Sequence, residues 1–281
     1  MPAVSVCVPV YNGARYLRAT LASVLDQDYD DYEVVVLDNA STDGTPVILA
    51  DLDDPRVRVV RNDRLLSLPD NWRRVCELAQ GRYLKVVCAD DLVSQNCLRS
   101  QAEVLDASPG ISLVASRRDV VDAQGRPLAQ GKGLRFLLGR HPGRDVARLA
   151  ALLGINPIGE SAGVMFRAQD YHDLGGWDGS LVYPMDLDMW LRLLTRGDLY
   201  GQSECLAAYR VSSVSVTSSF SDRQYAEQQE FMLRVAGDKQ WRLPAGFRQL
   251  ARVSAPCALW TWSLRHKMEA ARQSAVVRRP R

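Results

Sequence analysis

The chain has 281 residues, of which 47% are hydrophobic and 24% charged, as is usual for a globular protein large enough to bury a core. Its formal net charge of +2 excludes the strong basic field that general nucleic-acid binding requires, so we expect no nucleic-acid partner. The six cysteines form no Cys-x-x-Cys pair and no zinc-ligand spacing, which argues against a disulfide framework. Cys7 and Cys88 fall inside predicted strands, where we expect small core side chains.

The N-terminal segment MPAVSVCVPV lacks the basic residues that begin a signal peptide. No stretch of the sequence approaches the ~20 apolar residues of a membrane-spanning helix. We therefore expect a cytoplasmic protein.

The first 110 residues alternate between strand and helix patterns. Short apolar runs predict strands, at residues 3–9, 33–38, 56–61 and 82–89. Apolar residues at helical spacing and capping residues predict the helices between them, at residues 14–27, from 44 or 45 onward, and 70–80. Asp70 is the expected N-cap of the last of these helices. This order predicts an α/β fold with a doubly wound, mostly parallel sheet.

The rhythm changes after residue 110. The sequence predicts strands at 111–122 and 162–167, and helices at 143–153 and 187–195. A turn-rich segment at 123–133 is expected to be mobile, and residues 177–185 to form a loop. The tail after residue 222 is predicted to be helical and becomes basic toward its end.

Polar groups follow three of the predicted strands at their carboxyl ends. Asp90 and Asp91 follow the strand at 82–89, Asp38 ends the strand at 33–38, and a break at Pro9 ends the first strand. In an open α/β sheet, ligands bind outside the carboxyl ends of the strands. Two adjacent carboxylates there suit a hard divalent cation that also contacts a diphosphate.

Five segments resemble the motifs of family 2 glycosyltransferases. In chain order they are VSVCVPVYNG, EVVVLDNASTDGT, DNWRRVCELAQGRYLKVVCADDL, LGGWDGSLVYPMDLDMWLRLL and YRVSSVSVTS, which together span about residues 3–220. Each is weakly specific alone, but their order and spacing together are highly specific. The resemblance implies the GT-A fold and an inverting transfer of a sugar, hexosyl or deoxyhexosyl, from a nucleotide-diphosphate-sugar to an acceptor hydroxyl. It also suggests a role in the synthesis of a cell-surface glycan or glycoconjugate.

The resemblance assigns the acid pair to a divalent metal, Mg²⁺ or Mn²⁺. Asp91 is the stronger candidate for direct metal contact, and Asp90 for contact with the metal, the sugar or the ribose. The alternative is a helix cap that follows a strand. Many relatives complete the metal shell with a histidine where this chain has Ser212, so metal binding would depend on Asp91, the diphosphate and water. Arg210 would clamp the diphosphate, or pair within its own loop.

The resemblance also assigns a nucleotide site. Tyr11 can stack on the base, unless it belongs to a plain strand-to-helix turn. The residues that match the family's nucleotide-binding positions are Pro9, Val10, Tyr11, Asn12, Asp38 and Asn39, with Asn71 either helping to order the site or only beginning a helix. Many members carry two acids where this chain has Asp38-Asn39, so uridine, deoxythymidine and guanosine all stay candidates. Ser41 and Asp43 are expected to shape the turn.

The general base is expected at the start of a helix, in the segment MDLDMWLR. Asp186 falls on the family's base position, and Met185 replaces a frequent glutamate. Asp188 is the alternative base, and both acids could instead serve only as caps. Trp177 and Tyr183 precede the base and are candidates for an acceptor platform, with core packing as the alternative.

The sequence divides into three parts. Residues 1–115 are expected to form the nucleotide-sugar-binding half, residues 116–220 the acceptor-binding half of the same domain, and residues 221–281 a helical, basic extension. An apolar face with Trp260 in that extension suggests peripheral contact with the inner face of the membrane, or packing on the catalytic domain. The acceptor would be a glycan, a lipid-linked molecule or a small molecule.

Two other functions were weighed against glycosyl transfer. A dinucleotide-binding oxidoreductase is rejected because the first strand is followed by VYNGARYL and not by G-x-G-x-x-G. A non-catalytic nucleotide- or glycan-binding relative stays open because Met185 and Ser212 depart from the family pattern.

Overall fold

The computed structural model describes the chain except residues 212–221, 245, 248, 250–251 and 253–281. In the described part the strands form one ten-stranded sheet with the order β3-β2-β1-β4-β9-β6-β10-β5, to which β7 adds beside β6 and β8 beside β10. The strands are β1 Val4–Val10, β2 Tyr32–Asp38, β3 Val57–Arg61, β4 Tyr83–Val86, β5 Leu92–Val93, β6 Ile111–Val121, β7 Pro127–Lys132, β8 Gly139–His141, β9 Val164–Arg167 and β10 Asp198–Arg210. The predicted α/β fold is therefore confirmed.

The sheet has a parallel part and a mixed part. Strands β3, β2, β1 and β4 are parallel neighbours, so their carboxyl ends lie at one edge. Strand β9 runs antiparallel to both β4 and β6 and joins the two parts, while β10 is parallel to β6. The two predicted halves thus share one continuous sheet.

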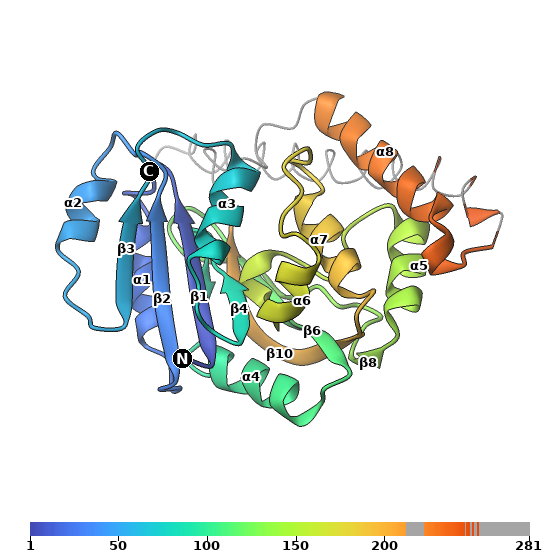
Figure 1. The fold of residues 1–281 in the computed structure, drawn as a ribbon, viewed down its shortest axis with the longest axis horizontal. Helices are drawn as coiled ribbons and strands as arrows, with labels where there is room; N and C mark the ends of the chain where they lie inside the picture. The colour runs from blue at the N-terminus through green and yellow to red at the C-terminus, as the bar shows by residue number, and fades with distance from the viewer. Residues whose placement is uncertain (212–221, 245, 248, 250–251, 253–281) are drawn as a thin grey trace, which may run out of the picture.

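Helices cover both faces of the sheet, as Figure 1 shows. They are α1 Leu17–Leu25, α2 Thr45–Ala50, α3 Leu68–Glu77, α4 Cys97–Ala107, α5 Gly143–Leu153, α6 Ala168–Asp173, α7 Met185–Leu193 and α8 Asp222–Gly237, with short 3-10 turns at Ser161–Gly163 and Lys239–Trp241. One core packs under α1, α2 and α4, and the other under α3, α5, α6 and α7. Successive side chains of β1 point to opposite faces of the sheet, so the strand contributes to both cores. Val6 and Val8 lie in the first core and Cys7 in the second.

The basic tail begins as predicted with a helix. Helix α8 lies beside α5 (Figure 1), with Phe231 and Met232 buried in the second core. The Gln228 amide donates to the Gly154 carbonyl at the end of α5 (3.3 Å). No helix among the described residues is long and apolar enough to cross a membrane.

One local expectation is wrong, and one turn-rich segment contains a strand that was not predicted. The N-cap of α3 is Ser67, whose hydroxyl accepts from the backbone N–H of Asp70, so Asp70 lies in the first turn and not at the cap. The turn-rich segment 123–133 contains strand β7, which pairs with β6. The glycines of this segment have positive φ values, and the segment still forms a strand at the edge of the sheet.

Candidate active site

The acid pair lies in a tight turn after β4. The Asp91 N–H donates to the Cys88 carbonyl (3.0 Å), and the Thr20 hydroxyl of α1 donates to the Asp91 carbonyl (2.8 Å). Asp91 is 1% exposed, whereas Asp90 is half-buried. The turn is therefore held from one side by α1 through its backbone.

Arg210, at the end of β10, fixes this turn from the other side. Its N–H donates to Asp91 Oδ1 (3.1 Å), its Nε to the Asp90 carbonyl (2.9 Å) and its Nη1 to the Asp122 carbonyl (3.1 Å). The guanidinium lies over the ring of Tyr16, 4.7 Å from the centroid. Arg210 is 4% exposed, and its partners lie in distant segments and not in its own loop as the alternative expectation had it. Its Nε and Nη1 are therefore already engaged within the fold and are not available to a diphosphate.

The reaction centre, by which we mean Cys88, Asp90, Asp91 and Asp186, is rich in uncompensated negative charge. Burial raises the pKa of Asp91 well above its ordinary value, and the charge of Asp90 raises it further. Burial likewise raises the pKa of Asp90. One carboxylate oxygen from each acid and Cys88 Sγ all lie within 4.8 Å of one another. Two carboxylates in this arrangement fit a hard divalent cation, because its charge would offset the cost of burying both.

Asp186 lies in the first turn of α7. Its Oδ1 is buried without a hydrogen-bond partner among the described residues, and burial raises the pKa of Asp186 to about 7. The charge of Asp186 raises the pKa of both Asp91 and Cys88. The predicted base and the predicted metal pair are thus electrostatically coupled, although about 95 residues separate them in the sequence.

Asp188 has a different environment. Its Oδ2 accepts from Arg192 Nε (2.8 Å) one turn further along α7, and Arg192 Nη1 donates to the Leu174 carbonyl (3.2 Å). Burial raises the pKa of Asp188, and the charge of Arg192 lowers it in part. Asp188 is therefore engaged in an ion pair, whereas Asp186 is not.

The nucleotide side consists of two loops that hydrogen-bond to each other. The Asn12 N–H donates to Ser41 Oγ (2.9 Å), and Asn12 Oδ1 accepts from the Thr42 N–H (2.8 Å). Asp43 accepts from the Ala14 N–H (3.1 Å), which confirms that Ser41 and Asp43 shape the turn.

Around this loop pair, the exposed aromatic face belongs to Tyr11. Its side chain is 49% exposed, while Pro9 and Val10 are buried in β1 and can reach a ligand only through their backbone. Asn12 itself is exposed and has a positive φ of 50°.

A buried amide network supports the strand ends. Asn62 Nδ2 donates to both Asn39 Oδ1 (2.8 Å) and Asn71 Oδ1 (3.0 Å). Asn39 also binds the backbone of Leu66 in both directions. Asn39 and Asn71 are 4% and 3% exposed, so their side chains order the site from within.

Asp38 is buried at the base of the same loop. Its Oδ1 accepts from the Ser41 N–H (2.9 Å), and its Oδ2 forms an ion pair with Arg61 at the end of β3. Arg61 Nη2 also donates to the Ser41 carbonyl (2.9 Å), and the Arg61 side chain is 48% exposed. Arg61 therefore presents a cation at the edge where a nucleotide would lie.

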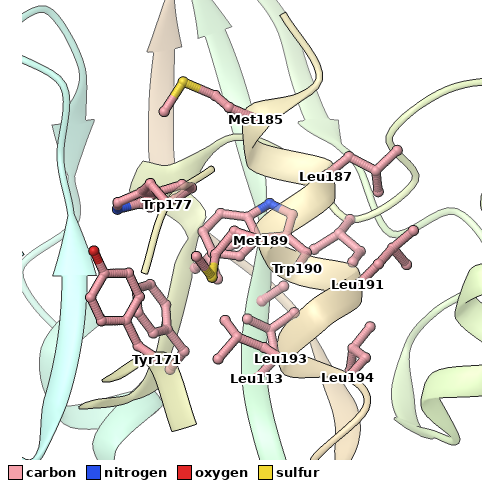
Figure 2. Packing of buried hydrophobic residues seen from close by; sticks show 14 of the residues in the cluster. Leu113, Tyr171, Trp177, Met185, Leu187, Met189, Trp190, Leu191, Leu193 and Leu194 are labelled. Atoms are coloured by element: carbon pink, nitrogen blue, oxygen red, sulfur yellow. The ribbon is translucent and has the colours of Figure 1, made fainter. Parts of the chain in front are cut away.

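Trp177 is a core residue. It is 0% exposed and packs edge-on against Trp72 and Trp190, at centroid distances of 5.1 and 5.7 Å. Figure 2 shows it between Tyr171 and helix α7. The expected acceptor platform is corrected at this position, because no face of the ring reaches solvent. Tyr183 is half-buried, and its N–H donates to Glu227 Oε2 of α8 (3.3 Å).

Sequence reasoning missed three residues of the site. Cys88 was expected in the core but lies beside the acid pair, because β4 ends at Val86. Arg61 ends the predicted strand β3, and Asn62 follows it. Because β3 is parallel to β2, its carboxyl end lies at the same edge of the sheet as Asp38, which could have identified both residues. Ser212 and the tryptophan-bearing C-terminal segment lie outside the described residues.

The chain is similar to known proteins in both sequence and fold. The model of a family described as glycosyl transferase family 2 matches residues 5–174. The putative teichuronic acid biosynthesis glycosyltransferase TuaG of Bacillus subtilis is 31% identical over 78% of this chain and 82% of its own length. An uncharacterized Mycobacterium tuberculosis protein, MT1568, is 32% identical over 69% of this chain, which spans 63% of that protein. The succinoglycan biosynthesis protein ExoO of Rhizobium meliloti is 35% identical over 46% of this chain and 36% of its own length.

Solved structures share the fold. TarS of S. aureus, also solved with UDP-GlcNAc, superposes with a TM-score of 0.68 at 17% identity, over 92% of this chain and 72% of that one. The mannosyltransferase PcManGT of Pyrobaculum calidifontis, in complex with GDP-Man and Mn²⁺, gives a TM-score of 0.61 at 19% identity, over 98% and 80%. At these identities the likeness establishes the GT-A fold alone. Since the family model matches more than half of the sequence, the chain belongs to glycosyl transferase family 2.

Proposed function

We propose that this protein is an inverting glycosyltransferase that moves a sugar from a nucleotide-diphosphate-sugar to an acceptor hydroxyl, in the synthesis of a cell-surface polysaccharide or glycoconjugate. The names of TuaG and ExoO, which concern teichuronic acid and succinoglycan biosynthesis, support the pathway class. The observation that carries the proposal is the buried carboxylate oxygen of Asp186, which has no partner among the described residues, together with the effect of the Asp186 charge on the pKa of Asp91.

The donor nucleotide would lie over the loops that follow β1 and β2. Tyr11 would stack on the base, and the Asp38–Arg61 pair would offer polar contacts to the base and ribose. The internally bonded Asn39 and Asn71 would hold these loops in place. Because their amides are already engaged, base selection would depend on Asp38, Arg61 and the backbone.

Asp91 and Asp90 would hold the divalent cation, Mg²⁺ or Mn²⁺. When bound, such an ion stabilises negative charge on the oxygens of a departing diphosphate. Arg210 would keep both acids in position through the backbone of their turn. Its role is then one of positioning and not of contact with the diphosphate.

Asp186 would accept the proton of the acceptor hydroxyl as that oxygen attacks the anomeric carbon. Inversion requires the hydroxyl and the leaving diphosphate on opposite faces of the sugar, so the base must stand across the sugar from the acid pair. A pKa near 7 suits a general base at neutral pH. Asp188 stays the second candidate, and its ion pair with Arg192 favours a supporting role.

The acceptor side would include Tyr183, which lies three residues before Asp186 and is half-buried. The proposed location is cytoplasmic, with the basic extension peripheral on the inner face of the membrane. Its eight arginine and lysine residues after position 247 and the face that includes Trp260 support this placement.

The test measures transfer and slow hydrolysis of UDP-, dTDP- and GDP-sugars with Mn²⁺, with Mg²⁺ and with EDTA. We expect turnover of one nucleotide class only with the metal, and loss of turnover in both Asp91→Asn and Asp186→Asn. Asp53→Asn, which changes an exposed aspartate far from the site, is the matched control. Nucleotide-sugar binding without any turnover by wild-type protein would support the non-catalytic alternative.

A further inference from the structure

A cavity of about 510 Å³ lies between β6, β7 and the C-terminal end of α5. We call it the basic pocket. Its lining includes four cationic side chains and no acidic one, contributed by Arg117, Arg118, Lys132 and Arg135. Among the described residues, the catalytic site explains none of these four cations. The pocket lies along β6 and β7, away from the β1 and β2 loops expected to hold the donor.

Most of this positive charge is unpaired. Arg118 forms an ion pair with Glu160, but in the described part of the chain Arg117, Lys132 and Arg135 have no acidic partner. Arg117 Nε and Arg118 Nη1 are buried and have no hydrogen-bond acceptor there. Buried donors without acceptors are costly, so the pocket favours an anion that brings several oxygens.

Two glycines lie against the Arg118 guanidinium, and one of them, Gly133, lines the pocket. Gly133 and Gly159 have φ values of 89° and 131°, and a Cβ at Gly133 would collide with the Arg118 guanidinium. Burial lowers the pKa of Arg118 to about 10, so the side chain still carries its charge at neutral pH. The backbone thus makes room for a desolvated cation that faces the cavity.

The rest of the lining is apolar and partly exposed. Phe136 is 58% exposed and Ile155 is 41% exposed, and Leu149 and Leu153 continue the same wall. Large exposed apolar side chains beside unpaired cations fit an amphiphile with an anionic head. A fully hydrophilic glycan would leave this wall in water.

One loop, residues 156–161, connects the pocket to the reaction centre. Asn156, in its lining, accepts from the Gly159 N–H (3.1 Å), and Trp190 of α7 donates to the Gly159 carbonyl (3.1 Å). The same loop continues to Ser161, whose Oγ lies 3.9 Å from Cys88 Sγ. The charge of Asp91 also acts on Arg118. An anionic head in the pocket would therefore lie on the acceptor side of the centre.

We propose that the basic pocket binds the phosphate or diphosphate of a lipid-linked acceptor, with the first part of the lipid chain against Phe136 and Ile155. This inference rests on the proposed function, since it names the acceptor class for the same reaction. Arg117, Arg118 and Lys132 would hold the phosphate oxygens, and the acceptor hydroxyl would extend toward Asp186.

The experiment measures the affinity of the full chain for dodecyl phosphate below its micelle concentration, for inorganic phosphate and for dodecanol, by calorimetry. We expect dodecyl phosphate to bind at least tenfold more tightly than either other probe. Arg117→Gln with Lys132→Gln should weaken its binding by a factor of ten or more, because charge-assisted hydrogen bonds are lost. Phe136→Ser should weaken dodecyl phosphate binding severalfold and leave inorganic phosphate unchanged. Arg196→Gln, an exposed arginine outside the pocket, is the matched control.

UDP, dTDP and GDP binding and metal-dependent donor hydrolysis are measured on the same variants. Nucleotide binding and donor hydrolysis should both be unchanged in the pocket variants. If wild-type protein hydrolyses no donor, the proposed function is overturned. The assignment of the pocket is then still tested by the measured affinities for dodecyl phosphate. Unaltered dodecyl phosphate binding in the double variant would overturn the pocket. Inorganic phosphate that binds as tightly as dodecyl phosphate would overturn the lipid-linked acceptor and favour a phosphate-bearing glycan.

Discussion

The two sides of the active site differ in how their polar groups are satisfied. On the nucleotide side, the side chains of Asn12 and Asn39 are bonded within the fold, as is Asn62 Nδ2, while Asn62 Oδ1 is buried without a partner among the described residues. In the reaction centre, Asp91 accepts one backbone N–H and Asp186 Oδ1 accepts none among the described residues. The first region is built before any ligand arrives, whereas the second keeps a surplus of negative charge that a cation and a proton must complete. Substitutions on the two sides should therefore fail in different ways.

The largest effect is expected for Asp91→Asn. A cation bound there would stabilise charge on the leaving group by several kcal/mol, so loss of its ligand should lower turnover by more than about 10³. Metal-dependent donor binding should disappear as well, which titration with Mn²⁺ followed by calorimetry measures. Near-normal turnover that EDTA still abolishes would place the metal elsewhere.

Asp186→Asn is expected to lower kcat by about 10² to 10⁴, with little change in donor affinity, because the carboxylate acts on the acceptor hydroxyl. Asp188→Asn is the matched control, since it makes the same change one half-turn along α7 and should cost less than about tenfold. Rate constants on folded protein decide the matter. A large loss for Asp188→Asn beside a mild one for Asp186→Asn would reverse the assignment of the base.

Asp186→Asn should also raise the free energy of unfolding. The folded pKa of Asp186, about 7, exceeds the ~3.9 of an unfolded aspartate, so the folded state holds the proton more tightly. The cost of the buried charge is therefore fully present above pH 7 and shrinks as the pH falls toward 4. At pH 8 without divalent cations, Asp186→Asn should melt at a higher temperature than wild type. A lower melting temperature would instead indicate a capping role.

Activity should depend on pH through the same group. A general base must be deprotonated, so kcat/KM should rise about tenfold per pH unit up to about pH 7 and level off above it. A bound cation favours the carboxylate and should move this midpoint downward. The rising limb should vanish in Asp186→Asn, and its persistence there would assign the titration to another group.

On the nucleotide side, Asn62→Ala should reduce stability before it reduces chemistry. It removes the donor to Asn39 and Asn71, at a cost of about 1–3 kcal/mol of unfolding free energy. The donor KM should rise severalfold with kcat nearly unchanged. Denaturant unfolding and steady-state kinetics measure the two, with exposed Asn96→Ala as the control. A fall in kcat at constant KM would mean that the network serves the chemical step.

The smallest effect is expected at Tyr11. Tyr11→Leu should weaken nucleotide binding by about 1 kcal/mol through loss of stacking, and Tyr11→Phe should change it little. Because the side chain is 49% exposed, the melting temperature should stay constant in both. Equal nucleotide affinity in wild type and Tyr11→Leu would remove the ring from the site.

The helices and strands that were predicted correctly have apolar residues that recur at a regular spacing. Helix α5 has the expected bounds, 143–153, because its apolar residues recur at helical spacing and Gly154 ends it in a left-handed conformation. Strand β10 escaped prediction because register shifts between Gln202 and Ala207 break its alternation. The mixed half of the sheet was therefore harder to predict than the parallel half.

For the site, local sequence identified the acids but not their partners. Asp90, Asp91 and Asp186 stand in recognisable motifs, and the charges of Asp90 and Asp186 both raise the pKa of Asp91. Whether Trp177 lies in the core and Arg210 binds backbone carbonyls depends on contacts between distant segments. No pattern within a motif distinguishes a buried ring from an exposed one.

Cys88 gives the centre an unexpected chemical property. Burial raises the pKa of its thiol well above the ordinary value, and Asp91, Asp90 and Asp186 raise it further. Only the thiolate reacts readily with oxidants and alkylating agents, so this cysteine is inert while the acids around it carry their charge. A divalent cation that neutralises those acids removes the electrostatic part of this protection, while the larger part, which comes from burial, stays. The alkylation rate of Cys88, followed by mass spectrometry of its peptide, is therefore a native reporter of the electrostatic state of the centre.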